Sequence, residues 1–365
     1  MASTSYPSGV DDWKGLFIAR MQESLSRSAA IRLTVWQPAG PLADGVKSVT
    51  SSQDLEWLNL LSLRGGIAHL LRKHPVSGVV HAISLLRRLN SAARINRPDI
   101  YHINWLQTAL ALPSDSRPAL VTALGTDMQL LRLPFLAGLL RRRFARRKVV
   151  ICPNADWMVA PLQRAFGAVA HVECVPFGID TSWYGVQRTP ILPMRWLCVS
   201  RLTTGKLGPL FEWAEPLFRD GTRELHLIGP QQDDRITVPE WVHFHGPATP
   251  EQLRDYWFPG ATGLLSLSTH PEGRPQVMLE AMAAGLPILS SRLPAHEDLI
   301  QHGETGWLCD SAYDFAEGLT RLELPLQNKA MGILARENVR VRFGTWDDCA
   351  RRYARQYETL LREFP

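Results

Sequence analysis

Short apolar segments alternate with helix-length segments along the whole chain. The strands predicted in the first half are residues 31–35, 100–104, 119–123 and 149–151, and those in the second half are 196–200, 224–228, 242–244, 263–267 and 287–290. Strands separated by helices pair in parallel and need helices on both faces of the sheet. The pattern therefore predicts an α/β fold, and 365 residues are enough for two Rossmann-like, doubly wound units.

The domain organisation follows from where this rhythm is interrupted. We predict a first Rossmann-like domain over residues 1–182 and a second over 195–342. Residues 183–194, with two prolines and little periodicity, form the predicted linker. A C-terminal helix over 343–365 is expected to cross back to the first domain. Ligands of such sheets bind beyond the carboxyl ends of the strands, so a cleft between the domains is the expected site.

The start of the chain departs from this scheme. A doubly wound domain opens on a buried strand, yet residues 6–9 read Tyr-Pro-Ser-Gly and lead directly to a helical pattern over 15–25. We therefore expect the first domain to lack its opening strand, through a late start codon or through real loss. A buried parallel strand within residues 1–8 would contradict this expectation.

Composition excludes several classes of protein. With 45% apolar and 21% charged residues and no apolar run near the roughly 18 residues that cross a bilayer, the chain reads as a soluble globular protein. Its five cysteines show no metal-binding or redox spacing, and its first residues lack the features of a signal peptide. The expected location is the reducing cytoplasm.

Charge is distributed unevenly. Residues 1–185 hold 21 Lys+Arg and 12 Asp+Glu, a net of +9, and the remainder carries a net of −4. The basic residues concentrate in Arg141–Lys148, directly after the apolar stretch 130–140. This predicts binding to an anionic membrane surface, peripherally on the inner face of the plasma membrane, with a solvated helix face as the alternative. The acidic second half argues against nucleic acid as a partner.

The most specific stretch of the sequence lies between His270 and Pro287. It places Glu272 on a loop after a strand and Glu280 on a helix predicted over 277–284, which Gly285 ends. A carboxylate can grip two vicinal hydroxyls, so each glutamate suits a sugar: one the transferred hexose, the other a ribose.

A phosphate is expected at the start of the same helix. The backbone N–H groups of Val277, Met278 and Leu279 would lie in its first turn, where unpaired donors and the helix dipole favour an anion. A second element, after the strand at 196–200, carries Arg201 and Lys206. These cations can converge on a pyrophosphate and stabilise the charge of a departing phosphate oxygen. Because the chain has no Asp-x-Asp motif, we expect a metal-independent reaction without a cofactor.

These elements resemble the signature of family 4 retaining glycosyltransferases. The spacing from Glu272 to Glu280 is similar to the family's E-x(7)-E, and Arg201 with Lys206 resembles its R-L-x-x-x-K-G diphosphate clamp. Residues 175–180 resemble the family's P-x-G-I-D at the domain junction. The resemblance implies the B-type architecture, in which two Rossmann-like domains face each other. It also implies retention of anomeric configuration without a covalent enzyme nucleophile.

The resemblance also implies roles for individual residues. Glu272, Arg201 and Lys206 would act in catalysis. Donor binding is implied for Gly15, Gly273, Arg274, Gln276, Val277, Met278, Leu279 and Glu280.

The first domain departs from the family where many members have H-G-x-D, because this chain reads Leu-Gly-Thr-Asp at 124–127. Asp127, His102 and Asn104 are therefore the candidates for a catalytic proton relay or for acceptor contacts. Capping of a helix by Asp127 and core packing of His102 are the alternatives.

The predicted function is transfer of a hexose from a UDP- or GDP-sugar to a lipid-linked or polysaccharide acceptor in cell-envelope glycan synthesis. Two alternatives share the architecture. One is a catalytically inactive module that binds sugar nucleotides or partners, suggested by the absent strand and by Leu124. The other is a sugar-nucleotide epimerase or phosphorylase.

Overall fold

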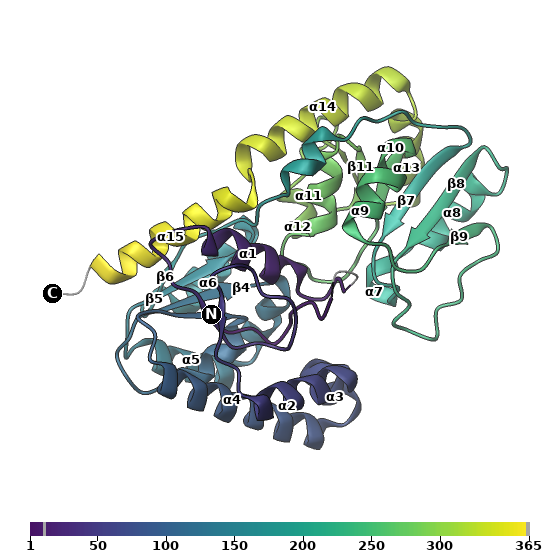
Figure 1. Cartoon of the computed structure of the whole chain (residues 1–365). Helices are drawn as coiled ribbons and strands as arrows, with labels where there is room; N and C mark the ends of the chain where they lie inside the picture. Colours follow the sequence, from purple (N-terminus) through teal and green to yellow (C-terminus); the bar gives the residue numbers. More distant parts are fainter. Residues whose placement is uncertain (10–11, 363–365) are drawn as a thin grey trace. The chain divides into compact units, whose positions relative to one another are not determined.

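The computed structural model describes residues 1–9 and 12–362, which form two compact units (Figure 1). Unit 1 comprises Met1–Pro176 and the C-terminal segment from Trp346, and unit 2 comprises Phe177–Thr345. The division differs from the predicted linker at 183–194. Trp183 is buried and packs against Phe258 at 5.2 Å between ring centroids, so the start of this segment packs into the core of unit 2. The last three residues of the predicted C-terminal helix lie outside the described residues.

Unit 1 is built on parallel strands in the order β3–β4–β5–β6. These strands are Tyr101–Asn104, Ala119–Ala123, Val149–Pro153 and His171–Val172, and a further parallel pair is β1 (Thr34–Val35) with β2 (Lys47–Ser48). Its helices are α1 (Leu16–Ser26), α2 (Ser52–Leu63), α3 (Gly66–Lys73), α4 (Pro75–Asn96), α5 (Pro134–Phe144), α6 (Val159–Phe166) and α15 (Trp346–Arg362). Short 3-10 helices η1 (Leu106–Ala111), η2 (Gly125–Arg132) and η3 (Asp156–Met158) complete the unit.

The expectation of a missing opening strand holds in part, because the described residues before Thr34 contain no strand and a single residue, Ala2, takes its place. Ala2 forms parallel bridges to Trp36 on one side and to Ile103 on the other. The N–H of Ala2 donates to the oxygen of His102 at 2.8 Å, and the N–H of Ser3 donates to the oxygen of Trp36 at 3.0 Å. Both Ala2 and Ser3 are buried. A single bridging residue is too short to show a strand periodicity, and only its pairing on both sides reveals that Ala2 fills the opening position.

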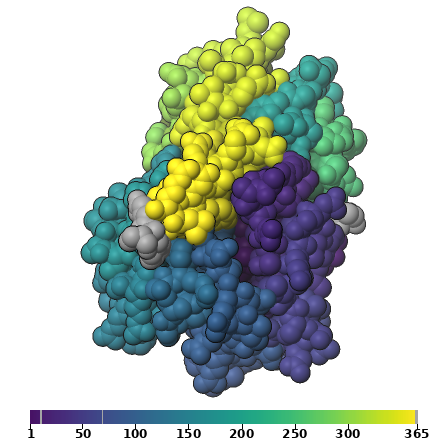
Figure 2. Space-filling view, turned by 60° about the vertical axis from the view of Figure 1, so that its left-hand side comes forward, coloured from purple at the N-terminus to yellow at the C-terminus, as the bar shows by residue number. Residues whose placement is uncertain are grey.

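Helix α15 is part of unit 1 although it ends the chain. Figure 2 shows it beside the N-terminal segment that contains α1. Tyr353 is fully buried, and its hydroxyl lies 3.1 Å from the hydroxyl of Thr122 on β4. The apolar and aromatic face of this amphipathic helix therefore covers the sheet of unit 1.

Unit 2 has a six-stranded parallel sheet in the order β12–β11–β10–β7–β8–β9 (Figure 1). In chain order its strands are β7 (Met194–Val199), β8 (Arg223–Ile228), β9 (Val242–Phe244), β10 (Gly263–Ser266), β11 (Ile288–Ser291) and β12 (Trp307–Cys309). The helices are η4 (Thr181–Gly185), α7 (Thr204–Leu207), α8 (Leu210–Phe218), α9 (Pro250–Gln252), the π-helix η5 (Leu253–Trp257), α10 (Phe258–Gly260), α11 (Gln276–Ala283), α12 (Pro294–Glu297), α13 (Ala312–Leu322) and α14 (Pro325–Arg342).

Both faces of this sheet are buried. On β7, Leu197 packs into a cluster with α11 residues such as Met278, whereas its neighbour Trp196 packs into a second cluster that includes Phe315 of α13. Successive side chains of a strand point to opposite faces, so a strand covered on both faces reads as a continuous apolar run. This explains why the strands of unit 2 were predictable as short apolar runs.

No helix within residues 1–9 and 12–362 is both long enough and apolar enough to cross a bilayer.

Candidate functional site

Two loops of unit 2 meet where strands β7 and β10 end. Gly208 closes α7 with φ 55°, and a Cβ on it would stand 2.0 Å from the carbonyl oxygen of Leu267. Only glycine tolerates both the positive φ and this close approach. The N–H of Thr269 then donates to the oxygen of Gly205 at 2.7 Å. The loop after β10 is thereby held against the α7 segment that carries Lys206.

Lys206 and Glu272 form an ion pair at this point. The Lys206 ammonium lies 2.6 Å from one carboxylate oxygen of Glu272, with side-chain exposures of 17% and 11%. The Ser268 hydroxyl donates to the other carboxylate oxygen at 2.9 Å. The side chain of Thr203 caps α7 by accepting from the backbone N–H of Lys206. Two residues predicted from separate motifs are therefore in direct contact.

The charges of the pair influence one another. Burial alone would raise the pKa of Glu272, but the charge of Lys206 and hydrogen bonds from Lys206 and Ser268 outweigh it and lower that pKa. Burial lowers the pKa of Lys206, Glu272 opposes this, and the positive charge of Arg201 lowers it further. Arg201 is thus close enough for its field to act on Lys206, as expected for two cations that serve one anion.

Helix α11 begins one residue earlier than predicted, at Gln276. The N–H groups of Met278 and Leu279 point back to the oxygen of Pro275 at 3.2 and 3.4 Å, and both side chains are fully buried. Within the described residues, the backbone N–H groups of Gln276 and Val277 have no backbone partner, and no side chain caps the helix. The backbone N–H groups expected to bind an anion are therefore those of Gln276 and Val277, one position closer to the N-terminus than predicted.

Other residues of the motif divide into two groups. The Arg274 side chain is 1% exposed, pairs with Asp298 at 2.5 Å and lies over the ring of Phe343 at 4.4 Å. This guanidinium therefore stabilises the loop from inside unit 2, and its assignment to donor binding stays a prediction. Gln276 donates to the oxygen of Gly178 at 3.0 Å, so it ties α11 to the segment that resembles the domain-junction motif.

Glu280 lies one turn after Gln276 on α11 and is half-buried. Residues four apart share a helix face, so Glu280 follows Gln276 on one side of α11. Gly273 lies on the loop between Glu272 and α11. The structure gives neither residue a contact that tests its predicted role in donor binding.

Sequence analysis missed His296. This residue of α12 is fully buried, and its Nδ1 lies 2.8 Å from the carbonyl oxygen of Ser291, whereas its Nε2 is buried without a hydrogen-bond partner. Burial lowers its pKa, the hydrogen bond to Ser291 and the charge of Glu272 oppose this, and Lys206 lowers it. His296 therefore lies within electrostatic reach of the ion pair. A lone histidine four residues from a strand carries no sequence signal, so only the fold could find it.

In unit 1, the position of Gly15 has a local explanation. Gly15 precedes α1 with φ 70°, and a Cβ would lie 2.7 to 2.8 Å from backbone atoms of Ser5 and Tyr6. The glycine is required so that the loop after Ala2 can pass the start of the helix. A contact with donor phosphate stays a prediction.

The two acceptor candidates are occupied inside unit 1. The Nδ1 of His102 lies 2.6 Å from the hydroxyl of Tyr357, and its Nε2 lies 2.8 Å from the hydroxyl of Thr122. Burial lowers the pKa of this imidazole well below its usual value. Asn104 is fully buried and donates to the oxygen of Ala2 at 3.1 Å. His102 is therefore a satisfied core histidine and Asn104 binds the bridging residue Ala2, so the core-packing alternative is observed for His102, and acceptor contacts stay a prediction.

Asp127 is fully buried at the start of η2. Its Oδ2 accepts from the N–H of Leu124 at 2.8 Å and from the N–H of Leu106 at 3.2 Å, whereas its Oδ1 has no partner. Burial raises the pKa of this carboxyl to about 7, against the two hydrogen bonds. Capping, the alternative weighed for Asp127, is thus observed, and its catalytic role stays a prediction.

A cavity of about 670 Å³ in unit 1 is lined by basic side chains. The arginines that line it are Arg87 and Arg94 of α4, Arg142 and Arg143 of α5, and Arg146 after α5. No carboxylate lines this basic groove, and its floor includes apolar residues of α4, α5 and η1. Arg147 does not contribute to it, since its buried guanidinium binds Asp115 and nearby backbone oxygens. Arg147 of the predicted basic run is therefore bound inside unit 1. Arg87 and Arg94 of α4 add cations that the sequence analysis had not included.

The same helix α4 exposes an apolar stripe. Val76, Val79, Val80 and Ile83 are 81%, 49%, 59% and 44% exposed. Their spacing places them on one helical face, which Arg87 continues at the next turn. Apolar and cationic side chains thus adjoin on one surface of unit 1.

Comparisons with known proteins address unit 2 most directly. Residues 194–323 match the protein family described as glycosyl transferases group 1. N-acetyl-alpha-D-glucosaminyl L-malate synthase from Bacillus anthracis is 33% identical over 100 residues. That stretch is 27% of this chain and 25% of the relative, so the match spans a quarter of the length of this curated relative.

Solved structures match the whole chain. Sucrose-phosphate synthase from Thermosynechococcus elongatus gives a TM-score of 0.75 at 16% identity, over 100% of this chain and 98% of that one. The Anabaena protein HepE in complex with UDP and glucose gives 0.59 at 15% identity, over 94% of this chain and 95% of that one. At these identities the likeness shows the fold, which is the two-unit GT-B architecture.

Proposed function

We propose that this chain, a member of the group 1 glycosyltransferases with the GT-B fold, is a retaining enzyme that transfers a hexose from a UDP- or GDP-sugar to a lipid-linked or polysaccharide acceptor. The acceptor would serve cell-envelope glycan synthesis on the cytoplasmic face of the membrane. Unit 2 would bind the nucleotide sugar and unit 1 the acceptor. The Anabaena protein of similar fold, solved in complex with UDP and glucose, supports a nucleoside diphosphate as the leaving group.

In the proposed reaction the bond between the anomeric carbon and the donor phosphate breaks, and the nucleoside diphosphate leaves with the electron pair. The acceptor hydroxyl attacks from the same face, and its proton passes to the departing phosphate oxygen. Arg201, Lys206 and the N–H groups that start α11 would stabilise the charge that develops on this oxygen. No covalent intermediate on the enzyme is required.

The ion pair of Lys206 and Glu272 is the observation that carries the proposal. Half-buried, oppositely charged groups at the carboxyl ends of parallel strands are costly unless they serve a ligand or are well paired. Glu272 stays ionised, as a carboxylate that grips sugar hydroxyls must. A diphosphate would compete with Glu272 for the Lys206 ammonium and would leave this carboxylate ready for the hexose.

The test is release of nucleoside diphosphate from a panel of UDP- and GDP-sugars, with glycan and polyprenyl-phosphate-linked acceptors. Lys206→Met should reduce turnover by roughly 10²–10³-fold, the effect of removing one preorganised charge from a transition state. Lys329→Met, at an exposed lysine of α14, is the matched control and should leave turnover unchanged. Anomeric coupling constants of the product report retention.

Removing one member of a buried pair also threatens folding, because it leaves an uncompensated charge. The double variant Lys206→Met with Glu272→Gln removes both charges and should stay folded but inactive. Full turnover in this double variant would refute the proposed site. Donor binding without turnover over the whole acceptor panel would instead favour the inactive-module alternative.

The membrane part of the proposal rests on α4 and on the basic groove. Val76, Val80 and Ile83 would enter the lipid interface while Arg87 and Arg142 bind lipid phosphates. The predicted contact was the basic run Arg141–Lys148, at the end of α5 and after it. The apolar stripe of α4 adds hydrophobic insertion to this electrostatic attraction.

Sedimentation with vesicles tests this contact. We expect binding to phosphatidylglycerol vesicles that weakens with salt, since surface charges are screened over about 8 Å at physiological ionic strength, and little binding to phosphatidylcholine. Val80→Asp and Arg142→Glu should each reduce binding, whereas Val341→Asp and Arg219→Glu on unit 2 should not. Equal binding to neutral vesicles would contradict the electrostatic component.

A further inference from the structure

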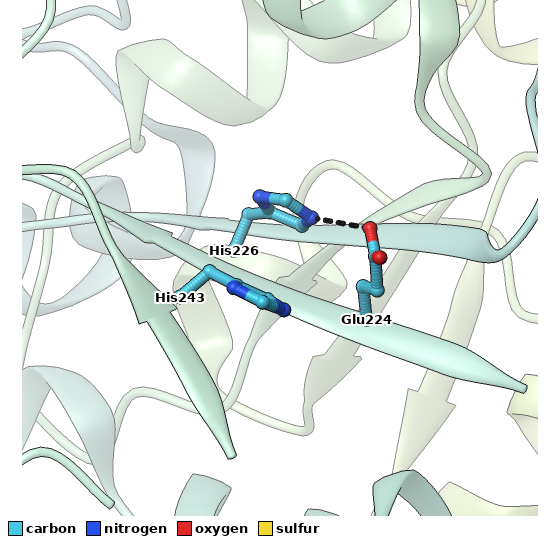
Figure 3. A group of neighbouring side chains, drawn as sticks. All are labelled: Glu224, His226 and His243. Atoms are coloured by element: carbon cyan, nitrogen blue, oxygen red, sulfur yellow. Dashed lines mark hydrogen bonds and ion pairs between the residues drawn. The ribbon is translucent and has the colours of Figure 1, made fainter. Parts of the chain in front are cut away.

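A cluster of histidines lies on one face of the unit 2 sheet, at its edge. Glu224 and His226 are two residues apart on β8, and β9, the edge strand, places His243 directly opposite His226. Alternate residues of a strand share a face, and direct cross-strand partners share it too. Figure 3 shows the three side chains gathered above the two strands.

The potential ligand atoms of this cluster converge. One ligand atom each from Glu224, His226 and His243 lies within 4.8 Å of the other two. Among the residues that the structure describes, this is the group whose histidine, cysteine or carboxylate atoms approach so closely. In a tetrahedral zinc site with bonds of about 2.0–2.1 Å, ligand atoms stand roughly 3.3 Å apart. His243 is exposed and Glu224 is half-buried, so both can rotate into that geometry.

The buried member of the cluster is already oriented. Nε2 of His226 lies 3.0 Å from the carboxylate of Glu224, and Nδ1 lies 2.9 Å from Nε2 of His245. The ring of His226 also packs against that of Trp257, at 5.6 Å between centroids. A metal-ligating histidine usually donates its second N–H to an acceptor that fixes the ring. His245 stands where that acceptor is needed.

We propose that Glu224, His226 and His243 bind a divalent transition metal, with Zn²⁺ as the best fit, that clips the edge strand β9 to β8. Two imidazoles and one carboxylate are ligands suited to zinc, with a water as the fourth. An exposed edge strand offers unpaired backbone groups to other chains, and a metal that anchors it would oppose that. The site uses none of the residues assigned to the donor, so it adds a property to the enzyme that glycosyl transfer does not require.

One neighbour opposes the bound cation. Arg195 of β7 pairs in register with Glu224, and its guanidinium lies 5.8 Å from the centroid of the Trp257 ring. A second positive charge near the metal weakens binding, so we expect a dissociation constant in the micromolar range, about −8 kcal/mol, rather than the nanomolar range.

The experiment is calorimetric titration of the full chain, stripped with a chelator, with Zn²⁺ alone. We expect one Zn²⁺ per chain, and we expect His243→Ala and Glu224→Gln to weaken binding at least tenfold. The matched control is His171→Ala, because His171 forms an isolated exposed pair with Glu173 at 3.3 Å in unit 1. His243 is exposed, so its replacement should not unfold the chain.

A second measurement separates a built site from surface binding. Zn²⁺ should raise the melting temperature of the wild type by mass action and should not raise that of His243→Ala. With Co²⁺ as probe, visible absorption of the intensity typical of four-coordinate cobalt should appear in the wild type and in His171→Ala. Absence of saturable binding below about 100 µM, or equal binding by His243→Ala, would overturn the proposal.

Discussion

The polar residues of the predicted motifs have different partners in the two units. In unit 2, Lys206 and Glu272 come from separate motifs and meet at the carboxyl ends of β7 and β10. In unit 1, His102 lies within β3 and binds Tyr357 and Thr122 inside the unit. Asp127 follows β4 and caps η2 through Oδ2, while its Oδ1 has no partner among the described residues.

This difference helps to distinguish polar side chains that could take part in a reaction from those that only stabilise the fold. A buried neutral side chain whose atoms all have internal partners contributes to the stability of the fold. A charged pair that burial makes costly has a better explanation when a ligand exploits it. By this criterion the ion pair of unit 2 is the better candidate for chemistry, whereas His102 contributes to the packing of unit 1.

The largest expected contrast is in turnover. Glu272→Gln should lower kcat by roughly 10²–10³-fold because it removes a charge that acts on the reacting sugar. His102→Leu, measured well below its melting temperature, should change kcat by less than about threefold, since it reaches no substrate. Steady-state kinetics with the best donor measure both. A loss of kcat in His102→Leu comparable to that in Glu272→Gln would contradict the interpretation of His102 as a packing residue.

The next contrast is in the pH dependence of stability. The pKa of Asp127 is raised from 3.8 to about 7, so the folded state binds more protons than the unfolded state between these values. The wild type therefore loses stability as pH rises through that window, by at most about 4 kcal/mol, and the effect is constant above it. Asp127→Asn cannot ionise. Its stability relative to the wild type should rise from pH 4 to pH 7 in urea unfolding, and a pH-independent difference would contradict the raised pKa.

A smaller effect is expected for the stability of the His102 network. His102→Leu leaves the hydroxyls of Tyr357 and Thr122 without their imidazole partner, which should cost about 1–3 kcal/mol. Tyr357→Phe removes one hydroxyl of the same network and should cost about 1 kcal/mol. Chemical denaturation measures both. If neither substitution changes the free energy of unfolding, the network does not stabilise unit 1.

The smallest expected effect concerns His296. His296→Asn keeps a donor near the Nδ1 position for the Ser291 oxygen, whereas His296→Gln keeps a polar group near Nε2. If Nε2 helps to position Glu272 or the donor, His296→Asn should lower kcat/KM by about tenfold, a loss of roughly 1.4 kcal/mol. His296→Gln should retain more activity. Equal kinetics for the two variants, with equal stability, would leave His296 as a packing residue.

Local sequence was sufficient for most secondary structure and for the separate motifs. The strands at 119–123 and 242–244 were predicted with their observed bounds, and Gly285 has the left-handed φ of 70° expected of a helix C-cap. Boundaries shifted where neighbours decided them: α11 starts at Gln276 because Pro275 precedes it. The pairing of Ala2 with Trp36 and Ile103 could not be predicted, because a single bridging residue carries no periodicity.

The sequence by itself determined the α/β class and the parallel strands, because apolar runs and glycine or proline positions act through neighbours along the chain. It also identified Lys206 and Glu272 as candidate site residues. Only the tertiary structure decided that these two touch, that Arg147 and Arg274 point inward, and that His226 meets His243. Contacts between residues far apart in the chain depend on sheet order and strand register, and no local pattern encodes these.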